Sequence, residues 1–549
     1  MIENKFSLRI IEDRQASEYE VAKGTTLLET IKEAGFLMPS PCGGNGKCGK
    51  CKVALVGNNL PEPTLEELDL LTPKEIENGY RLACKVILNN NLTITQDSGL
   101  RTQDYGVYTQ DSGLRTQDSD VLGLAIDIGT TTVAMYLVRL DNGEVLKAGS
   151  SLNPQIINGA DVISRIHYIG SSRYRLEEMR TLIISSINSM INNLLQAAGI
   201  DKNSITKVVV SGNTIMLHLL LGLNVEGIGV YPYTPSTTEM TVKNSQDAGI
   251  EVNPMGEIII LPSVSAFIGA DTLSGIIATG MYKSDDYCLL IDLGTNGEMV
   301  LGNKDRLIAC SAAMGPAFEG ANIEFGTASV EGAIDKVVIN QNGLFYSTIF
   351  NARPIGICGS GVIDAAAELL KAGVIDFRGR MLYKDWPEES YVSSHLAKRM
   401  SKYKGQPAFV LTEGEGRNNI VITQQDVRQV QLSKAAVAVG ISTLMEKLGV
   451  KFRNIKKVYL AGGFGSFINI ENAVKIGLIP EKLKGKIFPS GNTSAIGAIK
   501  CLVSPELIYD YIEVSKRVEY FDLNSIIDFQ NKYVDNINFR RSNSGQEKM

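Results

Sequence analysis

Four cysteines near the N-terminus have a spacing that suits an iron–sulfur cluster. Three lie in the glycine-rich segment PCGGNGKCGKC, and the fourth follows in RLACKV. Four thiolates must converge on two irons, and one loop wrapped around the cluster can supply three of them. Glycines let such a loop adopt backbone angles closed to other residues and bring N–H groups close to the sulfurs. The predicted ligands of this [2Fe-2S] cluster are Cys42, Cys48, Cys51 and Cys84.

The intervals between these cysteines separate the kinds of site they could form. Five residues lie between Cys42 and Cys48, where the plant-type pattern has four, so the segment resembles ferredoxins of the adrenodoxin and bacterial type. A zinc site is the alternative, because Cys-x-x-Cys pairs often bind zinc, but the segment contains only one such pair. Four other cysteines stand in apolar or small-residue surroundings and are predicted to be buried free thiols: Cys288, Cys310, Cys358 and Cys501.

The elements around the cysteines match a small β-grasp ferredoxin domain in residues 1–95. Phe6–Ile11 is predicted to be a strand, and the tetrapeptide TLLE has the pattern of a capping box that opens a short helix ending at Gly35. A second strand is predicted to leave the cluster loop at Lys52–Val56. Leu82–Thr95 is expected to form a closing hairpin around the fourth cysteine.

A tandem repeat follows this domain. The decapeptide TQDSGLRTQD occurs at Thr95–Asp104 and again, identically, at Thr109–Asp118. The repeat is too short and too polar to bury a core, so residues 96–120 are predicted to be a flexible linker. A chain of about 25 residues has a root-mean-square reach of roughly 25–30 Å. Such a tether would let the ferredoxin domain move between two docking positions.

Two similar hairpins beyond the linker carry a phosphate-binding pattern. AIDIGTTTVAMYLV lies in Leu122–Val138, and LLIDLGTNGEMVL lies in Cys288–Leu301. The glycine of each Asp-x-Gly-Thr turn lets the backbone approach a phosphate, and the turn offers N–H groups and hydroxyls to it. A purely structural turn is the alternative for either copy alone, but two copies favour a duplicated fold with a cleft between its halves. Asp127 and Asp292 are predicted to supply oxygens to Mg²⁺ or its waters, with Gly129, Thr130, Thr131, Thr132, Gly294, Thr295 and Asn296 around the phosphates.

Two further turns follow apolar strands. Val458–Phe467, with the sequence VYLAGGFGSF, runs from a strand into Gly462, Gly463 and Gly465. Ser211–Gly222 also follows an apolar strand and could be the counterpart of this turn in the first half. The sequence contains no Walker-type G-x-x-x-x-G-K-[ST] motif, so a P-loop fold is not the source of nucleotide binding.

The paired hairpins resemble the phosphate-1 and phosphate-2 motifs of the superfamily that contains acetate and sugar kinases, Hsp70 and actin. The resemblance implies that Gly462, Gly463 and Gly465 flank the adenosine of ATP. It also implies a multidomain α/β protein, in which a duplicated ATPase-like fold follows the ferredoxin domain and the linker. The first half of that fold is expected in residues 121–285, and the second half, with the phosphate-2 and adenosine motifs, in residues 286–549.

A [2Fe-2S] ferredoxin joined to this ATPase-like fold resembles one family closely, the reductive activators of corrinoid proteins. Further segments resemble that family: Pro262–Gly269 followed by Ala270-Asp271, GPAFEGANI at Gly315–Ile323, GICGSG at Gly356–Gly361, and QDVRQVQLSKAA at Gln425–Ala436. The resemblance implies ATP-dependent one-electron reduction of a corrinoid protein of a methyltransferase system, from Co(II) to Co(I). It also implies an external low-potential electron donor, and it is compatible with a homodimer.

The catalytic roles in the predicted nucleotide site differ in how far the sequence defines them. Asp127 and Asp292 are the first choices for the Mg²⁺–nucleotide site. Glu298 follows the second turn and either positions the attacking water or is an exposed strand residue. Asp271 is a further candidate, with helix capping as the alternative. The histidines lack metal-ligand spacing, and no role is predicted for them.

The composition bounds the other functions. A net charge of −6 with interspersed signs gives no nucleic-acid surface, and the sequence shows no leader pattern or long apolar span. A soluble cytoplasmic protein is therefore expected. Three alternatives remain open: a small-molecule kinase, an activator of the 2-hydroxyacyl-CoA dehydratase type, and a ferredoxin attached to a non-hydrolysing nucleotide fold.

Overall fold

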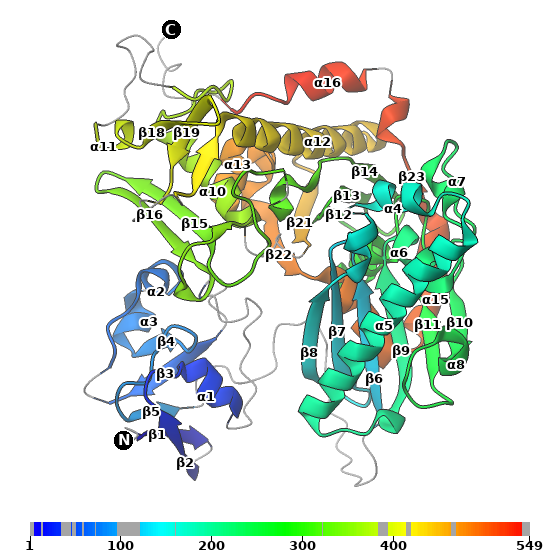
Figure 1. Cartoon of the computed structure of the whole chain (residues 1–549), viewed down its shortest axis with the longest axis horizontal. Coiled ribbons are helices and arrows are strands. Elements are labelled where there is room, and N and C mark those ends of the chain that lie inside the picture. Colours follow the sequence, from blue (N-terminus) through cyan, green and yellow to red (C-terminus); the bar gives the residue numbers. More distant parts are fainter. Residues whose placement is uncertain are drawn as a thin grey trace. The chain divides into compact units, whose positions relative to one another are not determined.

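The structure is a computed structural model of the chain, and it forms two compact units, one made chiefly of residues 1–106 and the other of residues 107–347 and 354–549. Figure 1 shows the elements of both units, which are described separately below. The described residues are 5–12, 15–33, 46, 51–57, 60–71, 73–95, 121–159, 161–320, 322–382, 394–412, 419–462, 468–526 and 528–540. The predicted linker, residues 96–120, lies outside them.

The first unit is built on one five-stranded sheet of order β2-β1-β5-β3-β4. β1 pairs antiparallel with β2 and parallel with β5, which is the arrangement expected for a β-grasp fold. Its strands and helices are β1 (Lys5–Glu12), β2 (Gln15–Ala22), α1 (Leu27–Glu33), β3 (Lys52–Val56), α2 (Leu65–Leu70), α3 (Pro73–Glu77), β4 (Tyr80–Leu82) and β5 (Leu92–Thr95).

The predicted capping box and strands of this unit are confirmed, but the predicted hairpin is wrong. Thr26 Oγ1 accepts a hydrogen bond from Glu29 N, and the Glu29 carboxylate accepts one from Thr26 N, at the start of α1. Gly35, the predicted end of this helix, lies outside the described residues. Within Leu82–Thr95, β4 and β5 do not pair with each other, because each pairs antiparallel with β3. This placement brings the residue before Cys84 beside the start of β3, where Ala83 N donates to Cys51 O over 2.8 Å.

The second unit contains two six-stranded sheets. The first has the order β10-β11-β9-β6-β7-β8, and the second has the order β22-β21-β12-β13-β14-β23. The strands of the first sheet are β6 (Leu122–Ile128), β7 (Thr132–Arg139), β8 (Val145–Leu152), β9 (Ile205–Gly212), β10 (Thr241–Asn244) and β11 (Glu257–Ile260). Those of the second are β12 (Tyr287–Leu293), β13 (Gly297–Gly302), β14 (Leu307–Ala312), β21 (Ile455–Ala461), β22 (Ile487–Gly491) and β23 (Val518–Tyr520).

Two three-stranded sheets and a set of helices complete the second unit. The small sheets are formed by β15 (Ala333–Asn340), β16 (Gly343–Thr348) and β17 (Gly356–Ile357), and by β18 (Met400–Tyr403), β19 (Gln406–Val410) and β20 (Val421–Thr423). The helices are α4 (Val162–Ile169), α5 (Arg173–Ala198), α6 (Thr214–Leu221), α7 (Glu226–Gly229), α8 (Ser245–Ala248), α9 (Ala270–Thr279), α10 (Gly359–Lys371), α11 (Ser394–Ala397), α12 (Gln424–Leu448), α13 (Ile470–Ile476), α14 (Thr493–Val503), α15 (Leu507–Arg517) and α16 (Phe529–Asp535).

The two large sheets repeat one strand plan, which confirms the predicted duplication. β6 lies between antiparallel β7 and parallel β9, and β12 lies between antiparallel β13 and parallel β21. Both predicted hairpins are therefore present. Each aspartate-bearing strand is central in its sheet, so its turn is held by neighbours on both sides.

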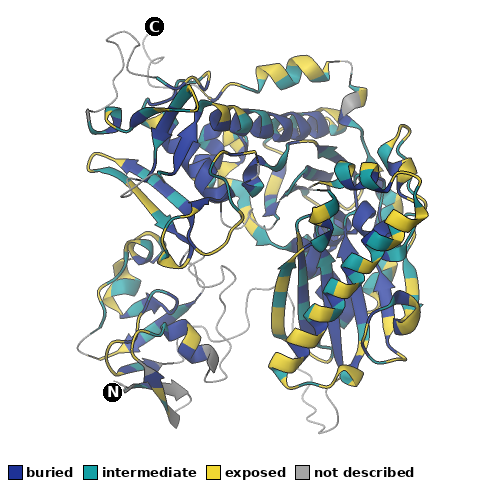
Figure 2. Cartoon of the chain, viewed as in Figure 1, coloured by how far each residue is buried: buried dark blue, intermediate teal, exposed yellow. Residues whose placement is uncertain are grey.

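Burial explains why the second hairpin begins with an unbroken apolar run. Side chains alternate across a strand, so Cys288 and Leu290 of β12 pack into one core while Leu289 and Ile291 pack into the other. Figure 2 shows the central strands of both large sheets buried, with exposed residues along α5. The predicted buried thiols are confirmed, since Cys288, Cys310, Cys358 and Cys501 are free and buried. None of the helices that the structure describes is long and apolar enough to cross a membrane.

Candidate nucleotide site and cluster site

The first Asp-x-Gly-Thr turn is fixed by hydrogen bonds to its backbone. Gly129 N donates to Thr132 O over 2.9 Å and closes the turn. Asn153 Nδ2 donates to Gly129 O over 2.9 Å, and Asn153 N donates to Thr131 O over 2.8 Å. Arg165 Nη2 donates to Thr130 O over 2.6 Å. The carbonyls of the turn thus point toward the protein.

Arg165 is a fully buried cation behind this turn. Its other donors go to Gly159 O, to the amide oxygen of Gln155 and to Met216 Sδ. Burial lowers the pKa of the guanidinium to about 10, against the opposing effect of Asp161. The guanidinium therefore remains charged near neutral pH and places positive charge behind a turn that is predicted to bind phosphate.

Asp127, at the end of β6, is held by the start of α14. Asn492 is the N-cap of that helix, and its Nδ2 donates to Asp127 Oδ2 over 2.7 Å. Ser494 Oγ donates to Asp127 Oδ1 over 2.6 Å. Burial raises the pKa of Asp127, and these two hydrogen bonds act in the opposite direction. The carboxylate therefore has a fixed orientation without any ligand.

The second turn is one residue shorter than the first and has fewer supports. Gly294 N donates to Asn296 O over 2.9 Å. Gly462, at the end of β21, has a φ of +100°, and a Cβ on it would lie 2.3 Å from Leu293 O and 2.8 Å from Asp292 Oδ1. Only glycine fits there. In the first half Gly212 takes the equivalent place, because its Cβ would lie 2.6 Å from Ile128 O.

Four carboxylates beside the two turns interact electrostatically, those of Asp127, Asp271, Asp292 and Glu298. Burial raises the pKa of Asp292 to about 7, with further increases from the charges of Asp271 and Asp127. Burial and Asp127 raise the pKa of Asp271 to about 6. Burial, Asp271 and Asp292 raise the pKa of Glu298 well above its ordinary value, although Ser311 Oγ donates to it over 3.0 Å. Within the described residues, no lysine or arginine forms an ion pair with any of the four.

The alternatives for two of these residues can be compared with their surroundings. Gly269 is the N-cap of α9, and Asp271 lies in the first turn, where its Oδ1 accepts a hydrogen bond from Thr272 N over 2.6 Å. Asp271 is therefore not the capping residue. Glu298 lies on β13 and is half-buried, not an exposed strand residue.

The acidic cluster fits a hydrated cation bound together with a phosphate. Grouped carboxylates with raised pKa values and without basic partners attract cations. In the part of the chain that the structure describes, no three His, Cys, Asp or Glu side chains are arranged to hold a metal ion alone. Mg²⁺ keeps several waters and is usually bound by one or two carboxylates plus substrate phosphates. The residues present therefore fit Mg²⁺ that arrives with a nucleotide.

The remaining predicted phosphate ligands have different surroundings. Thr130 is nearly buried and its Oγ1 accepts a hydrogen bond from Asn213 Nδ2 over 3.1 Å, whereas Thr132 is exposed at the start of β7. Asn296 is half-buried in the second turn. Gly463 and Gly465 lie outside the described residues.

Glu319 is a site residue that the sequence analysis missed. It lies at the end of the 3-10 helix η4 (Pro316–Glu319), and its Oε2 accepts hydrogen bonds from Thr131 Oγ1 and Thr295 Oγ1. The segment GPAFEGANI was singled out only as a family resemblance. Its position beside both turns was not visible in the pattern. Asn153, Arg165, Asn492 and Ser494 were missed as well.

The cluster site is described in part. Cys51 and Cys84 are buried, and their sulfurs lie 3.3 Å apart. Two sulfurs on one tetrahedral metal lie about 3.8 Å apart for a metal–sulfur bond of about 2.3 Å, so this pair is close to metal-binding geometry. Gly46 has a φ of +69°, a backbone conformation that favours glycine. Cys42 and Cys48 lie outside the described residues.

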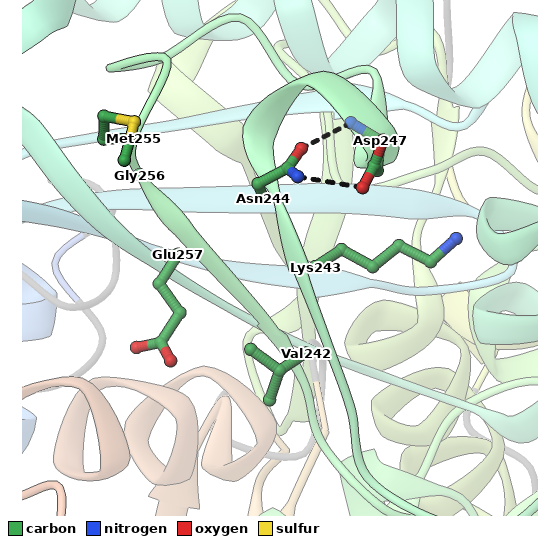
Figure 3. Close-up of a pocket in the computed structure, with 7 residues that line it drawn as sticks. All are labelled: Val242, Lys243, Asn244, Asp247, Met255, Gly256 and Glu257. Atoms are coloured by element: carbon green, nitrogen blue, oxygen red, sulfur yellow. Dashed lines mark hydrogen bonds between the residues drawn. The ribbon is translucent and has the colours of Figure 1, made fainter.

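A surface hollow of about 640 Å³ lies away from these groups, between β10, β11 and α8 (Figure 3). Asn244 and Asp247, which line it, are hydrogen-bonded to each other. The hollow contains none of the predicted nucleotide or cluster residues. It is lined by Val242, Lys243, Asn244, Asp247, Met255, Gly256 and Glu257.

Comparisons with known protein families divide the chain in three. Residues 10–89 match the 2Fe-2S iron-sulfur cluster binding domain. Residues 122–284 match the RACo middle region, and residues 286–548 match the C-terminal domain of RACo, the ASKHA domain. The first match supports a [2Fe-2S] cluster, and the last supports an ATP-binding fold of the sugar kinase, Hsp70 and actin type.

Individual relatives agree with these matches. The chain is 36% identical over 387 residues to "Corrinoid activation enzyme RamQ" of Eubacterium limosum. This match covers 70% of this chain and 65% of RamQ, slightly less than two thirds of that relative's length. The chain is 26% identical over 428 residues to "[Co(II) methylated amine-specific corrinoid protein] reductase" of Methanosarcina barkeri, covering 72% of each.

A solved structure extends the similarity over nearly the whole chain. The structure titled "Reductive activator for corrinoid,iron-sulfur protein" has 30% sequence identity and a TM-score of 0.71, and the match covers 97% of this chain and 98% of that one. The iron–sulfur domain, the duplicated ATPase-like fold and this full-length likeness together place the chain in the family of reductive activators of corrinoid proteins.

Proposed function

We propose that this protein uses ATP hydrolysis to drive one-electron reduction of a corrinoid protein, returning its cobalt from Co(II) to Co(I). An external low-potential donor supplies the electron, and the hydrolysis converts ATP and water to ADP and phosphate. The observation that carries the proposal is the joining of two sites in one chain of this family. These are a cysteine pair with sulfurs 3.3 Å apart in a [2Fe-2S] domain and a carboxylate cluster between two phosphate-type turns.

Four cysteines would hold the cluster, namely Cys42, Cys48, Cys51 and Cys84. When bound, a [2Fe-2S] cluster supplies one-electron transfer. Burial of Cys51 and Cys84 shields that end of the site from water.

In the nucleotide site, each half contributes one turn. Thr131 and Thr295 donate hydroxyl hydrogen bonds to the phosphates, and the turn glycines let the backbone approach them. Arg165 adds positive charge behind the first turn. Asp292 and Asp127 would hold Mg²⁺ through their oxygens or through bound waters, and Asp127 is already oriented by Asn492 and Ser494. Gly462, with Gly463 and Gly465, flanks the adenosine.

Asp271 is the candidate for positioning the attacking water. A general base works best with a pKa near the operating pH, and the pKa of Asp271 is raised to about 6. Its carboxylate lies on the first turn of α9, where its only described hydrogen-bond donor is the adjacent Thr272. Glu298, tied to Ser311 Oγ and with a pKa well above its ordinary value, is the second candidate.

Hydrolysis can drive the electron transfer only through a difference in affinity between states. Nucleotide binding between the two turns changes the arrangement of the two halves of the fold. A change in that arrangement can favour one complex with the corrinoid protein over another. Such a change makes electron delivery depend on the nucleotide state.

The test is an anaerobic trapping experiment. The chemically reduced protein is mixed with a Co(II) corrinoid protein from the same cell, and any Co(I) is trapped by methylation. The mixture contains Mg-ATP, a non-hydrolysable analogue or no nucleotide. We expect methylated product only with hydrolysable ATP. Equal trapping without nucleotide would show that the nucleotide fold does not drive the reduction, and stoichiometric phosphorylation of a small molecule would favour a kinase instead.

A further inference from the structure

One oxygen of Glu319 connects the two phosphate-binding turns. Thr131 Oγ1, from the first turn, donates to Glu319 Oε2 over 3.2 Å, and Thr295 Oγ1, from the second turn, donates to the same atom over 2.9 Å. The proposed function assigns these two hydroxyls to the phosphates of ATP. A carboxylate oxygen of Glu319 therefore occupies a place suited to a phosphate oxygen.

The other Glu319 oxygen lies over the second turn. A Cβ on Gly294 would stand 3.9 Å from Glu319 Oε1, so the carboxylate faces the backbone that a phosphate would approach. Within the described residues, no lysine or arginine forms an ion pair with Glu319. Burial raises its pKa, while the two threonine hydroxyls oppose the rise. Among the described residues, two neutral hydroxyl donors thus hold this carboxylate.

The loop that carries Glu319 has little room to move as a whole. A Cβ on Gly320 would lie 2.3 Å from Thr327 O, and a Cβ on Gly326 would lie 1.7 Å from Gly320 O. A Cβ on Gly359 would lie 1.7 Å from Phe318 O. Backbone contacts this close mean that the loop is packed on both sides. Displacement of the carboxylate must therefore occur mainly by rotation of the Glu319 side chain.

We propose that Glu319 is a place-holder for the terminal phosphate and sets the preference between triphosphate and diphosphate. The inference rests on the proposed function, because it takes the two turns as the phosphate site. A terminal phosphate would accept the same two hydroxyl hydrogen bonds. Its negative charge would repel the carboxylate of Glu319 if that carboxylate stayed beside the two hydroxyls. A triphosphate binds only when Glu319 rotates away, whereas a diphosphate that ends short of the two hydroxyls leaves Glu319 in place.

This arrangement has a consequence that distinguishes it from a purely structural role. The displacement of a charged side chain lowers the affinity for ATP and not the affinity for ADP. Removal of the charge should therefore tighten ATP binding. A residue that merely joins the turns would act in the opposite way, since its loss would loosen the site for both nucleotides.

The test measures equilibrium binding of ADP and of a non-hydrolysable ATP analogue, with Mg²⁺, to the full chain carrying its cluster. Wild type is compared with Glu319→Gln, which keeps the size and an acceptor oxygen, and with Glu319→Ala. Glu324→Gln is the matched control, because Glu324 follows on the same loop and pairs with Lys404, away from the turns. We expect both Glu319 variants to bind the analogue at least about tenfold more tightly, with ADP affinity changed less than about twofold.

The other results are equally decisive. Analogue binding that is unchanged in Glu319→Gln and weaker in Glu319→Ala would identify a structural bridge and overturn the place-holder. Equal tightening of ADP and analogue would overturn the role in discrimination. If the wild-type protein binds neither nucleotide, the proposed function itself fails. If it binds both and only the Glu319 effect is absent, the inference alone fails.

Discussion

The two Asp-x-Gly-Thr turns join equivalent strands, but they differ by one residue in length and in their surroundings. In the first, Asn153 and Arg165 donate hydrogen bonds to three consecutive carbonyls, those of residues 129–131. No such bonds are described for the carbonyls of Gly294 and Thr295 in the second turn. The first turn is thus held in place by the protein, and the second is held mainly by its own strands and by Gly462.

The aspartates of the two turns differ in the same way. Asp127 accepts hydrogen bonds from Asn492 and Ser494. Asp292 accepts none from the described residues, and burial with Asp271 and Asp127 raises its pKa to about 7. A carboxylate that is already satisfied orients a ligand, whereas one surrounded by like charges gains most from a cation. The two halves therefore keep equivalent strands, but the first aspartate is suited to orient a ligand and the second is suited to bind a cation.

Asp292→Ala is expected to have the largest effect on the difference between the two turns. If Asp292 supplies the essential contact to Mg²⁺, ATP hydrolysis and ATP-dependent Co(I) trapping should fall at least about 100-fold. Folding should not suffer, because the substitution removes a buried like charge and breaks no described hydrogen bond. We expect the thermal unfolding midpoint of the nucleotide-free protein to stay constant or rise.

The control for that prediction is Asp285→Ala, which removes a nearby aspartate with an 85% exposed side chain. It should leave both activities unchanged. An Asp292→Ala protein that hydrolyses ATP at the wild-type rate would show that the second turn does not bind the metal. A large fall in its unfolding midpoint would show that Asp292 makes a stabilising interaction in the folded protein.

Asp127→Ala should show the opposite balance, with a cost in stability. The substitution leaves Asn492 Nδ2 and Ser494 Oγ without their acceptor, and a buried donor left unpaired costs about 1–3 kcal/mol. We expect the free energy of unfolding to fall by about 2 kcal/mol, measured by denaturant unfolding at constant pH. The double variant with Ser494→Ala should lose less than the two single losses combined, because both variants remove the same hydrogen bond. If the losses of the two single variants add fully, or if Asp127→Ala is as stable as wild type, the hydrogen bonds from Asn492 and Ser494 to Asp127 do not stabilise the first turn.

Local patterns explain what the sequence could predict. The two hairpins, the strand before Gly462 and the capping box at Thr26 depend on residues that are neighbours in the chain, so alternation and turn chemistry reveal them. The β4–β5 hairpin was wrong for the same reason. Proximity in sequence suggested that the segments around Cys84 pair with each other, while burial of Leu82 and Ile94 in one core with β3 placed that strand between them.

The supports of the site could not be predicted, because they come from distant segments. Glu319 is 188 positions from Thr131 and Arg165 is 35 positions from Thr130. Ser494 is 367 positions from Asp127. Nothing in the sequence around these residues distinguishes a hydrogen bond to the turn from an ordinary surface or core position. The fold that brings them together is visible only when both sheets are assembled.

The smallest expected effect is a pH dependence of stability that belongs to the second turn. The pKa of Asp292 is raised to about 7 and that of Asp271 to about 6, above the value of about 3.9 for an unfolded aspartate. A carboxyl with a raised folded pKa stabilises the fold at pH values below the unfolded pKa, and this contribution is lost as the pH rises to the folded pKa. The nucleotide-free protein should therefore lose stability through these groups between about pH 4 and pH 7.

Through these groups the free energy of unfolding should fall by at most about 1 kcal/mol per pH unit, since partial exposure to water reduces the electrostatic effect. Comparison with Asp292→Asn isolates the second turn. The unfolding midpoint of the variant should rise relative to that of wild type from about pH 4 to pH 7, and the difference should stay constant above pH 7. Asp127→Asn should show a weaker trend, because the hydrogen bonds from Asn492 and Ser494 oppose the rise in the pKa of Asp127. The same pH trend in both variants would mean that the two aspartates share one electrostatic environment, and the division of chemistry between the turns would be lost.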